Sequence, residues 1–248
     1  MRFEMRCSLL FAFAFTSIVF SFSSPKCTNA YQADELSEDE AKQVQATERF
    51  LKVLEKSPRR GTALDRVYGH HVEFGSLDKF LEQLNQRVAK DDKDTEAWML
   101  LGLFESQRGT DAAAVEAFRK AATLRPQDPL APYYLGQSLL RIGQSVEAVA
   151  AFEQALARKP TRNDLLEIFQ QLGRVHQRAQ RTDEALKVWQ RLETLFPEDP
   201  RVLEQIAVTL AEEGGYALAL PRYQRLAENR DQRGICLRAL CCELSSEP

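Results

Sequence analysis

Cysteine is absent from the whole middle of this sequence. Residues 28–235 contain none, and the five cysteines are confined to the two ends of the chain. Glycine and proline are also scarce, with 11 and 10 residues in a chain of 248, which argues against extended disorder. The middle of the chain therefore folds without disulfides, and its 44% apolar and 28% charged residues are typical of a soluble globular protein.

A strong charge of either sign is also missing, because the formal net charge is only -3. Nucleic acid and anionic membrane surfaces attract proteins with large basic fields, so neither is predicted as the main partner. The sequence has no glycine-rich phosphate loop, no nucleophile elbow and no pattern that indicates a Ser-His-Asp triad. We therefore expect no catalytic residues, no enzyme activity and no cofactor.

The first thirty residues differ from the rest. Arg2 and Arg6 precede an uncharged run from Leu9 to Phe22, and small residues follow up to Ala30. This pattern predicts a signal peptide at 1–30 and export to the periplasm, the envelope or the medium. The alternative is an uncleaved anchor, although the run is shorter than the roughly 20 residues that span a membrane. After cleavage we expect no membrane span.

The middle of the chain repeats itself at a distance of 34 residues. The aligned identities are Leu101 with Leu135, Gly102 with Gly136, Gly109 with Gly143, Ala114 with Ala148, Phe118 with Phe152, Ala121 with Ala155, and Pro126 with Pro160. A third copy follows after three extra residues near 161–163, and it carries Gly173, Ala185, Trp189 and Pro197. A fourth, weaker copy follows the third and carries Ala207, Ala219 and Tyr223. Such a repeat predicts stacked structural units.

Each unit is predicted to contain two helices. In the first strong copy, Trp98 and Leu101 begin one helical stripe, Gly109 interrupts it, and Ala114 and Phe118 begin a second. The prolines at the end of each copy stop the second helix, since proline lacks the amide hydrogen that a helix needs. Polar residues after the break are predicted N-caps of the second helix; they are Asp111, Ser145 and Thr182.

This series of residues, together with its period, resembles the tetratricopeptide repeat, here of an exported bacterial type. The resemblance implies an all-α, right-handed superhelical solenoid of about five helix hairpins. The predicted units are a signal peptide (1–30), an N-terminal helix and linker (31–60), a degenerate first repeat (61–94), three strong repeats (95–128, 129–162 and 166–199), a degenerate last repeat (200–231) and a cysteine-containing tail (232–248).

The resemblance also implies that the first helix of each repeat lines a concave groove for a peptide or protein. The groove positions of the three strong repeats are Met99, Leu103, Gln107, Tyr133, Gln137, Arg141, Gln170, Arg174 and Arg178. They predict an aromatic and amide-bearing centre with a basic side, which suits an acidic or amide-rich segment with apolar anchors. The alternative is that these residues form an ordinary solvated helix face. The Lys and Asn clamp that binds chaperone tails in this family is not present at these positions.

His70 and His71, followed by Glu73, are the residues that most resemble a metal site. However, His71 and His176 share one repeat position, where a bulky side chain packs between helices, and no third ligand is evident. Both histidines are therefore predicted to pack, and no metal is expected.

The tail holds Cys236, Cys241 and Cys242 within a few residues. It is predicted to be either a capping helix or a disordered segment, and the change in composition also fits truncation or an altered reading frame. For the whole chain we expect a non-catalytic scaffold that binds a protein or peptide and organises an exported or envelope complex. The alternative is the recognition arm of a larger enzyme or assembly machine, and an RNA reader is disfavoured by the acidic charge balance.

Overall fold

The computed structural model describes residues 38–197 and 199–228, which form eleven helices and no strand. The helices are α1 (Glu38–Lys56), α2 (Thr62–Glu73), α3 (Leu77–Lys90), α4 (Thr95–Arg108), α5 (Asp111–Leu124), α6 (Leu130–Arg141), α7 (Ser145–Ala157), α8 (Arg162–Arg178), α9 (Thr182–Leu195), α10 (Pro200–Glu212) and α11 (Tyr216–Glu228). None of these helices combines the length and the apolar character that crossing a membrane requires. The predicted signal peptide and the tail at 232–248 lie outside the described residues.

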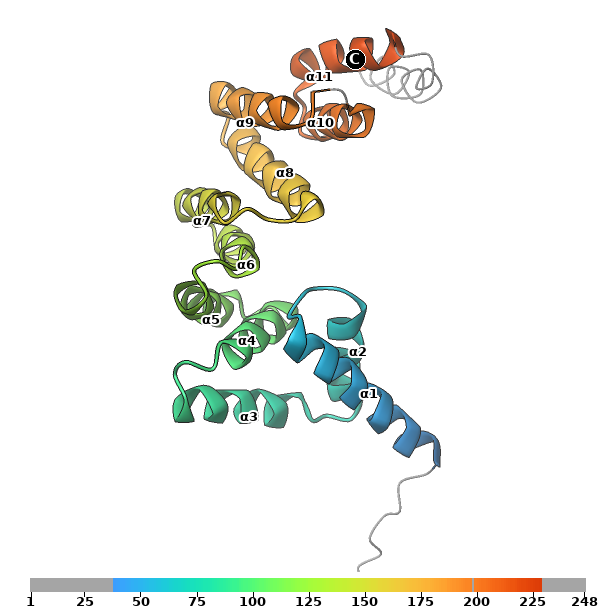
Figure 1. The fold of residues 1–248 in the computed structure, drawn as a ribbon, viewed down its shortest axis with the longest axis vertical. Helices are drawn as coiled ribbons and strands as arrows, with labels where there is room; N and C mark the ends of the chain where they lie inside the picture. The colour runs from blue at the N-terminus through green and yellow to red at the C-terminus, as the bar shows by residue number, and fades with distance from the viewer. Residues whose placement is uncertain (1–37, 198, 229–248) are drawn as a thin grey trace, which may run out of the picture.

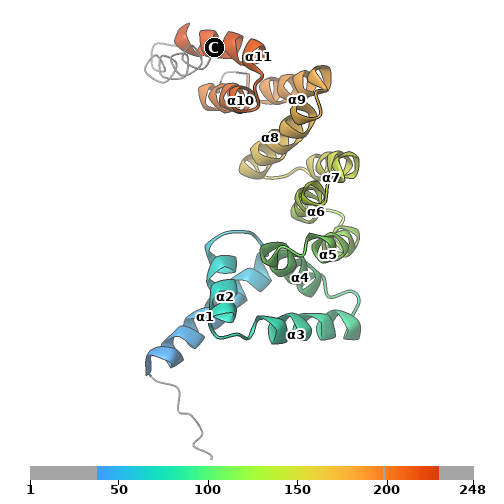
Figure 2. The same cartoon turned by 180° about the vertical axis from the view of Figure 1, so that it is seen from behind.

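The helices stack along one long axis (Figure 1). Four consecutive pairs form antiparallel hairpins, namely α4 with α5, α6 with α7, α8 with α9, and α10 with α11. Viewed from behind, the same stack rises from α3 to α11, with α1 and α2 beside its lower part (Figure 2). The prediction of an all-α solenoid of helix hairpins is confirmed.

Each strong hairpin is closed by an aromatic ring that lies on a glycine. A Cβ atom added at Gly102 would lie 2.6 Å from the ring of Phe118, and one at Gly136 would lie 2.6 Å from the ring of Phe152. At Gly173 the distance to the Trp189 ring would be only 2.0 Å. These rings are buried, so the glycines are needed because no side chain fits between the two helices.

Three of the first helices, α4, α8 and α10, begin at side-chain caps, whereas α6 and the second helices α5, α7 and α9 do not. The carboxylate of Asp94 accepts a hydrogen bond from the Ala97 amide at 2.9 Å, and Asp199 caps α10 in the same way. The predicted N-caps Asp111, Ser145 and Thr182 need correction. Each is the first residue inside its helix, one position after the cap, and no side-chain capping bond forms there.

Successive hairpins of the stack are not all joined to the same extent. Helix α5 packs extensively on α6, but α7 makes a smaller contact with α8, after the three-residue insertion. Beside this joint, Arg158 donates hydrogen bonds of 2.8 to 3.0 Å to the carbonyls of Ala122, Arg125 and Asp128. A cation is favourable there because the end of α5 exposes unpaired carbonyl groups.

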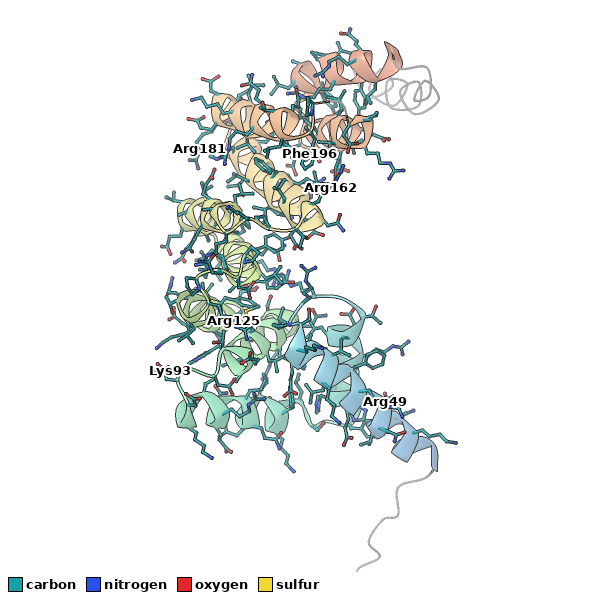
Figure 3. All side chains as sticks on the ribbon, in the orientation of Figure 1. Arg49, Lys93, Arg125, Arg162, Arg181 and Phe196 are labelled. Carbon is teal, nitrogen blue, oxygen red and sulfur yellow. The ribbon has the colours of Figure 1, made fainter. Side chains whose placement is uncertain are left out.

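On the far side of the joint, the start of α8 is linked to the end of the same hairpin. The guanidinium of Arg162 lies 4.8 Å from the centre of the Phe196 ring and pairs with Asp199. Figure 3 labels Arg162 and Phe196, whose side chains lie close together beside α8. Since Asp199 also caps α10, this cluster connects α8, α9 and α10.

The degenerate first repeat does not close as a hairpin. Helix α2 packs mainly against α1 and only slightly against α3, while α3 packs on α4. Tyr68 stands where the strong repeats have their glycine, and Phe80 stands where they have a small alanine. Two bulky residues cannot pack at the distance that Gly102 and Ala114 allow, so the two helices separate and Phe80 contacts Phe104 instead, with ring centres 4.9 Å apart.

The two histidines at the shared repeat position both pack against neighbouring elements. His71 stacks on Phe80 with ring centres 4.3 Å apart, and its Nδ1 lies 2.8 Å from the hydroxyl of Ser76. His176 is buried on α8, and its Nδ1 has no hydrogen-bond partner among the described residues. Burial lowers the pKa of both imidazoles; a neighbouring cation, Arg181, lowers that of His176 further.

Replacing the glycine at the tightest contact should destabilise the fold. Gly173→Ala forces a methyl group into the Trp189 ring, and overpacking of this kind costs about 1–3 kcal/mol. The 2.0 Å contact places this cost at the upper end of the range, and alanine recovers up to about 1 kcal/mol through its higher helix propensity. We therefore expect a net loss of about 1–2 kcal/mol in urea unfolding. The matched control is Gly69→Ala in α2, where a Cβ meets no atom within 4 Å. This control should gain about 0.5–1 kcal/mol, and equal effects at both sites would contradict the proposed closure of the hairpin.

Acidification should weaken the folded state through His176. Because the folded-state pKa is lowered, the unfolded chain binds more protons as the pH falls through the ordinary histidine value of 6.5. The contribution of neutral, buried His176 to the free energy of unfolding is therefore fully present above this pH, and it is lost as the pH falls below it. His176→Leu removes both the titration and the unpaired buried nitrogen. Urea unfolding at about pH 7.5 and about pH 5.5 should show a smaller decrease in the variant, whereas an identical decrease would contradict this role.

Candidate partner-binding groove

The inner side of the stack is formed by the first helices of the repeats, α4, α6, α8 and α10. Helix α4 contacts α6 although α5 lies between them in the sequence, and α8 contacts α10 although α9 lies between them. Such contacts require the first helices to lie on the inside of the curve. The nine residues predicted to line the groove all lie on three of these helices, α4, α6 and α8.

Met99 and Leu103 were predicted to lie on the open groove, but both are fully buried. The reason is that α1, which precedes the repeats, packs on α4 with the end that leads toward α2 (Figure 1). Leu54, near the end of α1, is also almost fully buried. This part of the prediction needs correction, because the first strong repeat presents Gln107 to solvent but not its two apolar groove residues.

The residues that follow α1 contact both α4 and α6, the first helices of the first two strong repeats. Arg60 donates to the hydroxyl of Ser106 on α4 at 2.6 Å and to the Gln137 side-chain oxygen on α6. Its backbone amide donates to the hydroxyl of Tyr134 at 3.0 Å. The Arg60 guanidinium also lies 5.3 Å from the centre of the Tyr134 ring, a distance at which a cation is attracted to an aromatic face. Gln137, a predicted groove residue, is therefore occupied by the chain itself.

The preceding residue, Arg59, extends this contact to α8. Arg59 forms an ion pair of 2.6 Å with Asp164, whose carboxylate is largely buried and also accepts a hydrogen bond of 2.6 Å from the Thr161 hydroxyl. Pro58 is buried. A single short segment thus contacts three successive first helices.

The electrostatics of this contact are unfavourable to Arg60. Its guanidinium is hydrogen-bonded to neutral oxygens, and burial lowers the pKa of Arg60, as does the nearby positive charge of Arg141. Arg141 donates to the same Ser106 hydroxyl at 2.6 Å and pairs with Asp111 at 2.7 Å. Two cations therefore converge on one neutral oxygen.

Tyr133 is also part of the inner face, but its ring is buried. Its hydroxyl accepts from Gln137 at 2.6 Å and donates to Glu167 at 3.1 Å. Burial and the negative charge of Glu167 both raise the pKa of Tyr133. The hydroxyl stays protonated and supports the orientation of Gln137.

The predicted basic side of the groove is neutralised by α10 and the residue after it. Arg174 pairs with Glu212 at 2.7 Å, and Arg178 pairs with Glu213 through hydrogen bonds of 2.7 and 2.8 Å. The hydrogen bond from Arg178 lowers the pKa of Glu213, while Glu213 raises the pKa of Arg178. The arginines that the sequence indicated are on the surface, but they do not form an uncompensated basic field.

The open part of the inner face is a hollow between α8 and α10, with a volume of about 290 Å³. It is lined by Gln170, Arg174, Arg201, Glu204, Gln205, Val208, Thr209 and Glu212. Only the first two were predicted. The same repeat positions that gave Gln170, Arg174 and Arg178 give Glu204, Val208 and Glu212 in the last repeat, so the signal was present. It was not used because that repeat lacks the closing proline and has Ala207 in place of glycine.

Within residues 38–197 and 199–228, no group of three or more His, Cys, Asp or Glu side chains could hold a metal ion. The lining of the hollow offers amides, paired charges and the exposed apolar residue Val208, which is 38% accessible. Such a surface can bind by shape and by hydrogen bonds.

Comparison with known proteins agrees with this architecture. Two crystal structures of MamA align with the chain at 18% identity. One has a TM-score of 0.51 and covers 68% of this chain and 96% of its own; the other has a TM-score of 0.52 and covers 69% and 92%. At this identity the similarity concerns the fold alone. None of the curated protein sequences matches the chain.

Family models match the repeats themselves. Two models, each described as the tetratricopeptide repeat, match residues 81–129 and 125–163 in one case and 166–209 in the other. These residues include α4 to α9, the helices whose hairpins are closed on glycine. Because the matches together cover just over half of the sequence, the chain belongs to the tetratricopeptide repeat family.

Proposed function

We propose that this protein is a non-catalytic scaffold that binds a protein or peptide on its inner face. The observation that carries the proposal is the hollow between α8 and α10, which lies at the positions where this family presents side chains to a ligand. From the signal-like first thirty residues, we further propose that the protein is exported and organises a periplasmic, envelope-associated or secreted complex.

The lining of the hollow indicates the chemistry of the ligand. Val208 offers an apolar contact, while Gln170 and Gln205 can donate to and accept from the backbone of an extended peptide. Arg174 and Glu212 already pair with each other, so a ligand gains little from a single strong charge. An extended, amide-rich segment with one apolar anchor suits this surface better than a highly acidic one.

The test is selection of peptides from a random library on the full-length chain, followed by affinity measurement with the selected peptides. Arg201→Glu and Val208→Asp change the hollow at two exposed positions, and each should weaken binding by about tenfold or more, as expected for loss of about 1.4 kcal/mol. Both changes lie on the surface, so the melting temperature should be little affected.

The matched control is Lys187→Glu, which reverses an exposed charge on α9, a second helix outside the hollow. It should leave peptide affinity unchanged. If the peptides bound all three variants as tightly as the original chain, the hollow between α8 and α10 would not be the binding surface.

A further inference from the structure

The residues Pro58, Arg59 and Arg60, here called the arginine segment, occupy the inner face as a bound peptide would. The segment lies between α1 and α2, outside the tetratricopeptide repeats, yet it contacts α4, α6 and α8. Its contacts combine side-chain hydrogen bonds, an ion pair and a backbone hydrogen bond to Tyr134. These are the interactions by which an extended ligand is held in a groove.

The site is built for arginine. Two terminal nitrogens of Arg60 reach two different acceptors, Ser106 and Gln137, on different helices, while the flat guanidinium faces the Tyr134 ring. This arrangement uses the planar fork of arginine, which the single ammonium group of lysine cannot reproduce. A second arginine, Arg59, is matched by the buried carboxylate of Asp164. The spacing therefore selects two consecutive arginines.

The segment is also held in a way that permits release. Arg60 has neutral hydrogen-bond acceptors and a like charge, Arg141, close by, so its burial is only partly compensated. The side chain of Arg59 is 44% accessible, so solvent screens its ion pair with the buried Asp164 carboxylate from one side. The segment stays bound because the chain connects it to the site, which gives it a high effective concentration.

We propose that the inner face of α4, α6 and α8 is a recognition site for a diarginine segment of a protein partner, and that the arginine segment fills this site in cis until such a partner displaces it. The proposal rests on the function proposed above and names a second part of the same face. It assigns Ser106, Tyr134, Gln137 and Asp164 as the residues that recognise the two arginines.

The experiment uses the full-length chain and a fluorescent peptide with the sequence of residues 56–62. The unchanged chain should bind the peptide weakly, because its own segment competes. Arg59→Ala together with Arg60→Ala empties the site and should bind the peptide at least about tenfold more tightly, since the internal competitor is lost. Equal affinity for both chains, or no binding to the variant, would overturn the proposal.

Two controls define the site. On the double-alanine background, Gln137→Ala and Asp164→Asn should each reverse the gain in affinity, whereas Lys187→Glu should not. A peptide in which both arginines are lysine should bind much more weakly than the original. Full retention of affinity in the lysine peptide would overturn recognition of arginine.

A measurement on the unchanged chain covers the case in which the double variant does not fold. Hydrogen exchange of residues 57–61, followed by mass spectrometry, should become faster when the diarginine peptide is added in excess and should not respond to the lysine peptide. Exchange that is unaffected by both peptides would overturn displacement. If the affinity of the library peptides still depended on Arg201 and Val208, the hollow between α8 and α10 would remain the binding surface. The two proposals can therefore fail separately.

Discussion

The close approach of two helix backbones at a glycine is the constraint on which the rest of this structure depends. Phe118, Phe152 and Trp189 each lie flat on the glycine of the preceding helix, and this contact fixes how near the two helices of a hairpin can come. When the contact is present, the hairpin closes and its apolar stripe is covered by the next hairpin. When bulky residues replace both the glycine and the facing alanine, as at Tyr68 and Phe80, the helices separate and pack on other helices. The hairpin of α10 and α11 still forms, because Ala207 at the glycine position is also small.

Most of the fold could be predicted because its cause is local and periodic. The small residues, the aromatic residues and the closing prolines recur along the sequence, so the hairpins could be located without coordinates. The N-caps were misplaced by one residue because the sequence does not reveal where the turn after Gly109 ends. The open first hairpin could have been inferred from Tyr68 and Phe80, since both stand where only small residues fit.

The candidate site was less predictable. The repeat period gives the direction in which Met99 or Gln137 points, but not what lies in front of it. The covering elements, α1 and the arginine segment, are outside the repeats and carry no period that relates them to the groove. For the same reason the pairing of Arg174 with Glu212 could not be foreseen, because it joins side chains of two different repeats. The sequence thus predicted the surface and not its occupant.

The ion pair between Arg59 and Asp164 joins residues 105 positions apart in the chain. In an ideal array each unit meets only the units beside it, so the ends can melt independently of each other. Here the N-terminal region is tied directly to the hairpin beyond the joint between α7 and α8. Melting of α8 and melting of α1 are consequently coupled, and this array has a cooperativity that its repeats alone do not provide.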